Sequence, residues 1–286
     1  MTKKIAWVTD STAYITKELA EHPDVYILPI NITFDQDTYE DGVNLTTDIL
    51  YKRIREEKTV PKTSQPSVGK FAELYEKLKT EYDHAIAVHI SGKLSGTIDS
   101  STQGKNIAEF EVEIVDSKCM SYAITTLIEK GMHLAEEGKP YVEIAETLRE
   151  EASQSENYIL LGNLEQFYKG GRMSGAQYLL GNILQIKPII RINTQTGEFE
   201  LFERVRSEKK AVKRLIELLK KSYEENIIQQ VEIMHGNVIT KANGLKQKIQ
   251  QELPDINIVV GEISSTIAAH AGEGTVALIW HKEGTK

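Results

Sequence analysis

Short apolar runs that fit strands alternate with segments whose apolar residues recur at helical spacing. In the first half, strands are expected at residues 5–10, 25–34, 84–90 and 111–117. Helices are expected at residues 11–22, 48–58, 68–82, 97–108, 120–137 and 141–155. Pro29 interrupts the second strand and argues for a bend or a sheet edge there. Strands separated by helices pair in parallel through right-handed crossovers, so the pattern predicts an α/β sandwich.

The second half keeps the α/β alternation but differs in detail. A strand at residues 157–163 precedes a mostly apolar helix at residues 174–185, and two strands then flank a turn at Thr196 and Gly197. A long basic amphipathic helix at residues 208–223 is followed by strand, helix and strand, and the last strand is at residues 275–282. The fold class is therefore two α/β domains, a parallel-sheet domain at residues 1–155 and a mixed α/β domain at residues 156–286.

Composition narrows the class of protein. The chain has 286 residues, of which 40% are hydrophobic and 27% are charged, as in an ordinary globular protein. Its net charge of −8 argues against general attraction to nucleic acid or to an anionic membrane. Cys119 is the single cysteine, so no intrachain disulfide forms. With no signal peptide and no apolar stretch of roughly 20 residues, we expect a cytoplasmic protein without stable membrane insertion.

The turn ISGKLSGT at residues 90–97 lies at the carboxyl end of a predicted parallel strand, where such sheets bind ligands. Gly92 and Gly96 permit close approach, and Ser95 or Thr97 is suited to cap the next helix. The free N–H groups of a helix start favour an anion. The turn lacks the G-x-x-x-x-G-K-[ST] and G-x-S-x-G patterns, so it fits neither a nucleotide loop nor a hydrolase elbow.

Two other hydroxyl-bearing features stand at element ends. The loop PKTSQPS offers Thr63, Ser64 and Ser67 for capping or for ligand contact, and Ser67 is expected to be the N-cap of the next helix. Asp10 and Asp116 each end a predicted strand beside hydroxyl residues. They are expected to cap helices, with a metal ligand or a carboxylate nucleophile as the alternative.

Histidines and basic residues complete the candidates. The seven histidines show no metal-ligand spacing, so no metal is expected. His270 is singled out because it lies in a segment of small residues where a buried apolar wall is not expected. A glycine-containing loop and a later charge run carry candidate cations for a phosphate or a docking partner, namely Lys169, Arg172, Arg204 and Arg206.

Taken together, these segments resemble the DegV family, bacterial fatty-acid-binding proteins that serve as lipid-carrying subunits of fatty acid kinase. The resemblance spans the chain through the ordered motifs VTDST, KTSQPS, ISGKLSGT, VDSK, YKGGRMS, IKPII, ERVRSEKKA and AAHAGEG. The chain departs from the common family pattern at Gly92, Ala271 and Glu273.

The resemblance implies that one long-chain fatty acid occupies an internal ligand tunnel between or within the two domains. Thr63 and Ser95 would hydrogen-bond the carboxylate, with the amide of Gly96 beside them, and His270 would orient a hydroxyl or a bridging water. Residues 120–127 and 178–186 are candidates to line the tunnel. A partner kinase would phosphorylate the bound carboxylate, so the chain itself would be a carrier with no cofactor and no catalytic residue.

Two other functions stay open from the residues alone. A serine acyl-ester hydrolase would use Ser95 as nucleophile, His270 as base and Asp10 or Asp116 as the residue that orients the base. A module that binds a phospho-sugar or a nucleotide would need a phosphate site, and the missing phosphate loop counts against it.

Overall fold

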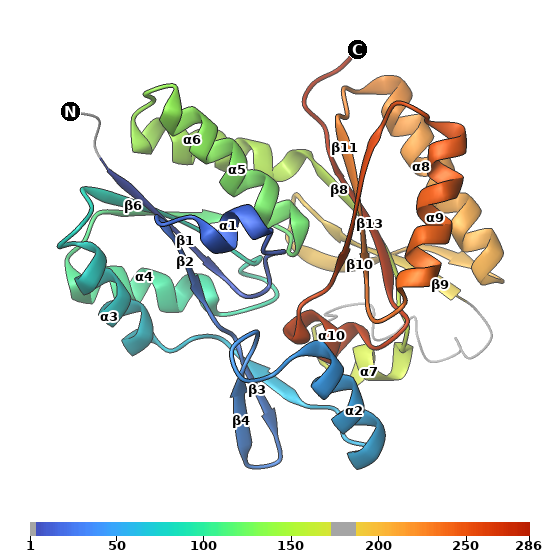
Figure 1. Cartoon of the computed structure of the whole chain (residues 1–286), viewed down its shortest axis with the longest axis horizontal. Coiled ribbons are helices and arrows are strands. Elements are labelled where there is room, and N and C mark those ends of the chain that lie inside the picture. Colours follow the sequence, from blue (N-terminus) through green and yellow to red (C-terminus); the bar gives the residue numbers. More distant parts are fainter. Residues whose placement is uncertain (1–3, 173–186) are drawn as a thin grey trace. The chain divides into compact units, whose positions relative to one another are not determined.

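The computed structural model describes residues 4–172 and 187–286, which form two compact units (Figure 1). Unit 1 holds Met1–Thr46, Pro61–Ser153 and Gln195–Gly197, and unit 2 holds Thr47–Val60, Gln154–Thr194 and Glu198–Lys286. The main division, after Ser153, lies close to the expected one at residue 155. The units differ from two uninterrupted ranges because Thr47–Val60 and Gln195–Gly197 each belong to the unit opposite to their chain neighbours.

Unit 1 contains the expected parallel sheet. Its strand order is β2-β1-β6-β7, and every neighbouring pair is parallel. The strands are β1 (Ile5–Asp10), β2 (Val25–Leu28), β6 (His84–His89) and β7 (Val112–Asp116). The helices are α1 (Lys17–Glu21), α3 (Val68–Leu78), α4 (Thr97–Ala108), α5 (Tyr122–Glu136) and α6 (Tyr141–Glu151). Figure 1 shows α3 and α4 on one face of the sheet and α5 and α6 on the other.

The alternation of side chains along β1 explains the two layers. Ala6 and Val8 face one core with Phe71 and Tyr75 of α3. Trp7 points the other way, where its ring lies so close to Gly131 of α5 that a Cβ on this glycine would be 2.6 Å away. The sheet is therefore buried on both faces, as parallel sheets usually are.

Unit 1 also has a small antiparallel sheet that the hydrophobic pattern did not predict. Its order is β4-β3-β5, with β3 at Asn31–Phe34, β4 at Asp37–Glu40 and β5 at Lys62–Ser64. The single strand expected at residues 25–34 is interrupted after Leu28, next to Pro29, and its two parts, β2 and β3, join different sheets. The bend expected at the proline is thus present.

Unit 2 contains a six-stranded mixed sheet in the order β10-β9-β8-β13-β11-β12. Only the β11–β12 pair is parallel, which confirms the mixed α/β class expected for this half. The strands are β8 (Ser155–Leu160), β9 (Lys187–Asn193), β10 (Glu198–Val205), β11 (Gln230–His235), β12 (Asn257–Glu262) and β13 (Val276–His281).

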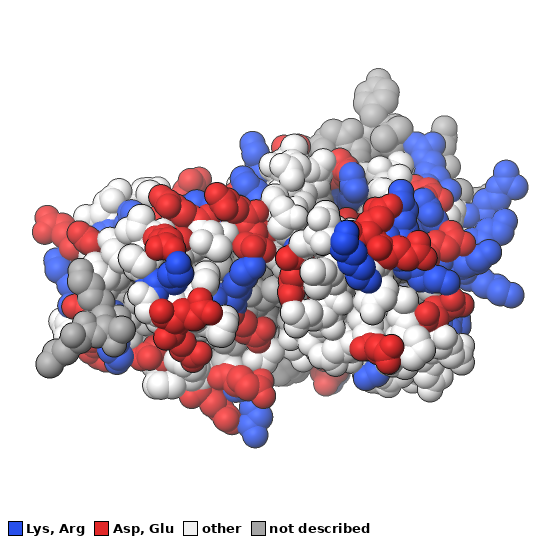
Figure 2. All heavy atoms as spheres, turned by 90° about the horizontal axis from the view of Figure 1, so that it is seen from above, with Lys and Arg blue, Asp and Glu red and all other residues white. Residues whose placement is uncertain are grey.

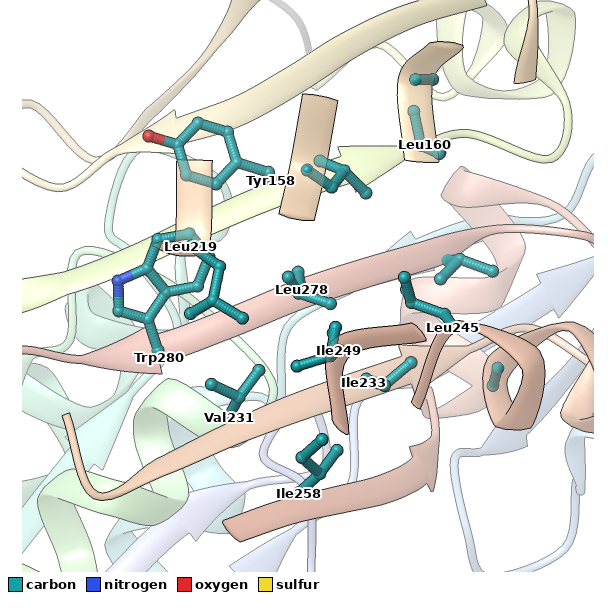
Figure 3. Packing of buried hydrophobic residues seen from close by; sticks show 14 of the residues in the cluster. Tyr158, Leu160, Leu219, Val231, Ile233, Leu245, Ile249, Ile258, Leu278 and Trp280 are labelled. Atoms are coloured by element: carbon teal, nitrogen blue, oxygen red, sulfur yellow. The ribbon is translucent and has the colours of Figure 1, made fainter. Parts of the chain in front are cut away.

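The core of unit 2 lies between this sheet and the helices α8 (Glu208–Glu225) and α9 (Ile239–Glu252). Figure 3 shows Leu219, Leu245 and Ile249 of these helices over strand residues such as Leu278 and Trp280. The Trp280 indole is fully buried, and its Nε1 donates to Ser222 Oγ at 3.0 Å. The described part of this unit also holds the helices α2 (Thr47–Glu57), α7 (Leu164–Lys169) and α10 (Ser265–Ala271).

Some sequence expectations need correction. The helix expected from residue 11 begins only at Lys17, because Thr16 is its N-cap and accepts a hydrogen bond from the Leu19 N–H. The helix expected to reach residue 155 ends at Glu151, continues as a 3-10 turn (Ala152–Gln154), and gives way to β8. The helix expected at residues 174–185 lies outside the described residues. Among the residues the structure describes, no helix is long and apolar enough to cross a membrane.

Candidate functional site

The turn after β6 is built around Ser91. This residue is fully buried, its N–H donates to Cys119 O at 2.9 Å, and its own carbonyl accepts from the N–H groups of Leu94 and Ser95. Its hydroxyl donates to Gly197 O at 2.8 Å. Ser91 therefore shapes the turn that leads to Ser95 and Gly96, which are both half-buried.

The N-terminus of α4 has no side-chain cap, contrary to the expectation for Ser95 or Thr97. Gly96 is the N-cap residue and has no side chain to accept from the helix. The Ser95 and Thr97 hydroxyls instead bond to each other, with 2.8 Å between Oγ and Oγ1. The amide groups of the first turn are therefore not used by a cap, and paired hydroxyls lie beside them. This combination is suited to an anion.

The loop PKTSQPS meets this turn. Ser67 caps α3 as predicted, since its Oγ accepts from Lys70 N at 3.3 Å. Two residues earlier, Gln65 lies against Gly96: a Cβ on the glycine would be 2.6 Å from Gln65 Nε2. Thr63 belongs to β5 of the same loop region. Unit 1 thus brings together the two hydroxyl-bearing loops that the sequence singled out separately.

A buried network at the ends of β1 and β6 lies directly before the turn. The Oδ2 atom of Asp10 is 3.1 Å from His89 Nδ1 and accepts from Ile90 N, also at 3.1 Å. Its Oδ1 accepts from the N–H and the hydroxyl of Thr12, at 3.0 and 2.5 Å. Asp10 was expected to cap a helix, which is wrong, because α1 begins at Lys17.

The network continues through the other nitrogen of the ring. His89 Nε2 is 3.1 Å from Ser101 Oγ, which is 2.6 Å from the Tyr75 hydroxyl, and all these side chains are buried. Burial alone would raise the pKa of Asp10, but hydrogen bonds and electrostatic attraction from His89, together with the Thr12 and Ile90 bonds, lower it below its ordinary value.

Sequence reasoning missed His89 and Ser101. The usable signal was that Asp10 and His89 are the last residues of two strands expected in one parallel sheet, whose ends lie at the same edge. Because Ser101 is fully buried, this Asp–His–Ser series has no hydroxyl open to a substrate.

Asp116, the other strand-end acid, binds a local partner. Its Oδ1 accepts from Lys118 N at 2.8 Å, and its Oδ2 lies 3.1 Å from Lys118 Nζ. The expectation that Asp116 caps a helix is also wrong, because the N-cap of α5 is Ser121.

In unit 2, His270 lies in the last turn of α10, a helix that the sequence did not predict. Six of its seven residues are buried, so the expectation that no buried wall exists around His270 is wrong. The imidazole packs against Gly170, where any Cβ would overlap Nδ1. Burial and the nearby positive charge of Arg172 lower the pKa of His270 to about 4, so the ring is neutral at pH 7.

Gln166 of α7 holds this part of α10. Its Nε2 donates to Ala268 O at 2.9 Å and to Ala269 O at 2.7 Å. The Asn163 N–H donates to Ala271 O, so Gln166 and the N-cap residue of α7 both bind carbonyl groups in the C-terminal half of α10. Sequence reasoning missed Gln166, because nothing in the pattern of α7 indicates which carbonyl groups it meets.

Glu273, the acid that departs from the family pattern, is bound by two donors. Arg55 Nη1 donates to its Oε2 at 2.7 Å, and Asn237 Nδ2 donates to its Oε1 at 2.6 Å. Its charge is therefore compensated within unit 2.

The predicted docking cations have different environments. Lys169 pairs with Glu165 at 2.7 Å, and Arg172 Nη1 donates to Gly170 O at 2.7 Å. Arg204 of β10 and Arg206, the first residue after this strand, are exposed on either side of the buried Val205. Figure 2 shows Lys and Arg side chains gathered over a part of unit 2, on the side where Figure 1 draws α8. No group of potential metal ligands occurs among the described residues.

The predicted fatty-acid site divides between the units. Thr63, Ser95 and Gly96 belong to unit 1, and His270 belongs to unit 2, so their union in one site stays a prediction. Of the candidate tunnel residues, those at 120–127 include the buried start of α5. Residues 178–186 lie outside the described residues.

Comparison with known proteins gives consistent results. A family model described as an uncharacterised protein of the DegV family matches residues 4–283. A DegV domain-containing protein of Listeria monocytogenes is 31% identical over 98% of this chain and 99% of its own. A solved structure of a fatty acid binding DegV family protein from Streptococcus agalactiae is 30% identical, with a TM-score of 0.92 over 99% of this chain and 100% of that one.

A second solved structure, of DegV, a fatty acid binding protein from Bacillus subtilis, is 28% identical, with a TM-score of 0.89 over 98% of this chain and 100% of that one. The family model and the relatives each cover nearly the whole chain, and the solved structures share its fold. This chain therefore belongs to the DegV family.

Proposed function

We propose that this protein binds a long-chain fatty acid and presents its carboxylate to a fatty acid kinase. The observation that carries the proposal is the contact of Gln65 with Gly96, which joins the Thr63 loop to the uncapped start of α4. Two similar DegV proteins of solved structure are themselves described as fatty acid binding.

The donors at this place suit a carboxylate that must stay reactive. Hydroxyl groups of Thr63 and Ser95 and the amide of Gly96 bind an anion without the bidentate geometry of an arginine, which would occupy both oxygens. His270 complements them as a neutral imidazole, which donates from one nitrogen and accepts at the other. It therefore orients a hydroxyl or a water without adding charge.

The acyl chain supplies most of the affinity in this proposal. Each buried methylene contributes about 0.8 kcal/mol, so a long tail outweighs a few hydrogen bonds at the head group. The carrier then needs no catalytic residue, since phosphoryl transfer to the carboxylate belongs to the kinase. Lys169, Arg172, Arg204 and Arg206 remain the residues we assign to kinase docking or to the transferred phosphate.

A serine hydrolase has less support from the residues of unit 1. The Asp10 carboxylate that would orient the base is bound by His89, and the hydroxyl of Ser95 is paired with that of Thr97. A fluorophosphonate probe is therefore expected to leave Ser95 unlabelled.

The first test is mass spectrometry of an organic extract of natively purified protein. One equivalent of free fatty acid is the expected result, and a phosphorylated polar ligand in its place would contradict the proposal. The second test measures acyl phosphate formation with a fatty acid kinase and the Thr63→Ala/Ser95→Ala double variant. Loss of product is expected, and an undiminished rate would exclude these residues from the site.

A further inference from the structure

Gln65 has a position in unit 1 that neither the motifs nor the comparisons explain. Its carboxamide lies on the backbone of Gly96, where an added Cβ would be 2.6 Å from Nε2 and 3.0 Å from Cδ. Such distances are far shorter than van der Waals contact, so a side chain at residue 96 and the present position of Gln65 exclude each other.

The local chain holds Gln65 in this position. Pro66 follows it, and a residue before proline is restricted to extended backbone conformations. The preceding strand β5 is fixed by pairing with β3, in the register Ile32 to Thr63. Since side chains alternate along an extended segment, Thr63 and Gln65 point to the same side. The side chain that reaches Gly96 is thus on the face that carries Thr63.

The carboxamide has hydrogen-bonding capacity that the described part of the chain does not use. Gln65 is exposed, and its side chain has no hydrogen-bond partner among the described residues. A carboxamide offers two N–H donors and a carbonyl acceptor. These donors lie beside Gly96, at the helix start that has no side-chain cap.

We infer that Gln65 is a further binding residue, whose carboxamide donates a hydrogen bond to the carboxylate of the bound acid. The inference rests on the proposed function. It adds Gln65 to the binding residues, and it adds a steric rule, namely that residue 96 must lack a side chain for the Gln65 carboxamide to keep its position. Gly96 is required because any side chain there displaces the Gln65 carboxamide, in addition to any role of the Gly96 amide.

The test uses delipidated full-length protein and calorimetric titration with oleate, with oleyl alcohol as a probe that has the same tail and no carboxylate. Gln65→Leu keeps most of the volume and removes the donors, so oleate affinity is expected to fall about 10-fold or more. Gln65→Glu places a carboxylate opposite the ligand's own, and a larger loss is expected. Affinity for oleyl alcohol should stay unchanged in both variants.

Gln103→Glu on the exposed part of α4 is the matched control for added charge, and its oleate affinity should equal that of the wild type. A variant cycle tests the steric rule. Gly96→Ala is expected to weaken oleate binding in the wild type and to have a much smaller effect in the Gln65→Ala background, because the displaced group is already absent.

The possible results distinguish a failure of the Gln65 inference from a failure of the proposed fatty-acid binding. If Gln65→Leu and Gln65→Glu bind oleate as tightly as the wild type does, the role of Gln65 is overturned and the proposed function stands. An equal loss of affinity for oleate and oleyl alcohol also overturns it, because the residue would then act on the tail or on the fold. Wild-type protein that binds no fatty acid overturns both proposals.

Discussion

Nδ1 of His89 lies 3.1 Å from Oδ2 of Asp10, and both side chains are fully buried. An ionised carboxylate only accepts hydrogen bonds, so Nδ1 carries a proton and donates it. The same carboxylate oxygen accepts from Ile90 N, the first residue after β6. Asp10 therefore connects the ends of β1 and β6 and fixes the start of the turn that carries Ser95.

Asp10→Ala is expected to destabilise unit 1 by roughly 3–5 kcal/mol, because buried donors of His89, Ile90 and Thr12 lose their acceptor. Hydrogen exchange of peptides from β1 and β6 measures the effect within this unit. Asp255→Ala, at an exposed acid of unit 2, is the control and should leave these peptides unchanged. Wild-type exchange in the Asp10 variant would show that the network contributes nothing to stability.

The same contacts predict an acid-sensitive unit 1. Burial opposes ionisation of Asp10, but the bonds from His89, Thr12 and Ile90 outweigh it, and the folded pKa is lowered. An unfolded aspartate titrates near pH ~3.9, so this stabilisation is present above that pH and is lost as pH falls through the folded pKa. Below pH ~4, the midpoint temperature of thermal unfolding should therefore depend less on pH in Asp10→Asn than in the wild type.

The fold favours the charged form of Asp10 but the neutral form of His270. The variant Arg172→Gln tests how far the arginine charge favours the neutral imidazole. Burial and the Arg172 charge lower the pKa of His270 to about 4, so removing the charge should raise this pKa. The unfolded ring protonates near pH ~6.5, so stability from neutral His270 is lost as pH falls from there toward the folded value. NMR titration of the imidazole gives the pKa directly. An unchanged pKa in Arg172→Gln would mean that burial alone lowers it.

The sequence predicted most of the regular structure because strong hydrophobic periodicity accompanies buried faces. β1, β6 and α3 follow that rule, since each packs on a core that its own pattern defines. β4 and β5 do not, because all their residues are exposed or half-buried and their pairing with β3 decides their conformation. α10 was missed for another reason: its Ala and Ser residues are buried by close packing, which gives no apolar stripe.

The candidate site was predictable in part for a similar reason. Thr63, Ser95 and Gly96 belong to motifs at element ends, where the need for hydroxyls and glycine can be read locally. Gln65 and Gln166 contact residues that are far away in the sequence. Gln65 lies against Gly96, and Gln166 donates to the carbonyl groups of Ala268 and Ala269. Such contacts depend on tertiary packing, and no local spacing indicates them.

Gln166→Leu should loosen α10 by about 1–3 kcal/mol, because carbonyl groups of Ala268 and Ala269 lose a buried donor. Gln166→Glu is the sharper variant, since an ionised carboxylate would face two carbonyl oxygens. Its folded pKa should rise, so this variant should regain stability as pH falls, unlike the leucine variant. Hydrogen exchange of α10 between pH 5 and pH 8 distinguishes the two. Equal pH dependence would exclude direct contact with the carbonyls.

Gly104 links the packing of unit 1 to the geometry of the proposed site. A Cβ on this glycine of α4 would overlap Phe71 and lie 2.9 Å from the backbone nitrogen of Ala72 in α3. Because α3 follows the loop of Thr63 and Gln65, and α4 follows the turn of Ser95, their close approach sets the distance between the two loops.

Gly104→Ala is therefore expected to cost about 1–3 kcal/mol and to weaken oleate binding as well, because the backbone of α3 cannot move aside cheaply. Gly244→Ala in α9 is the matched control. Nothing lies within 4 Å of its added Cβ, so the substitution should stabilise unit 2 by up to about 1 kcal/mol through helix propensity and leave binding unchanged. Thermal unfolding and oleate titration measure both effects. If Gly104→Ala lowered stability but left oleate affinity intact, the α3–α4 contact would support the fold without setting the spacing of the loops.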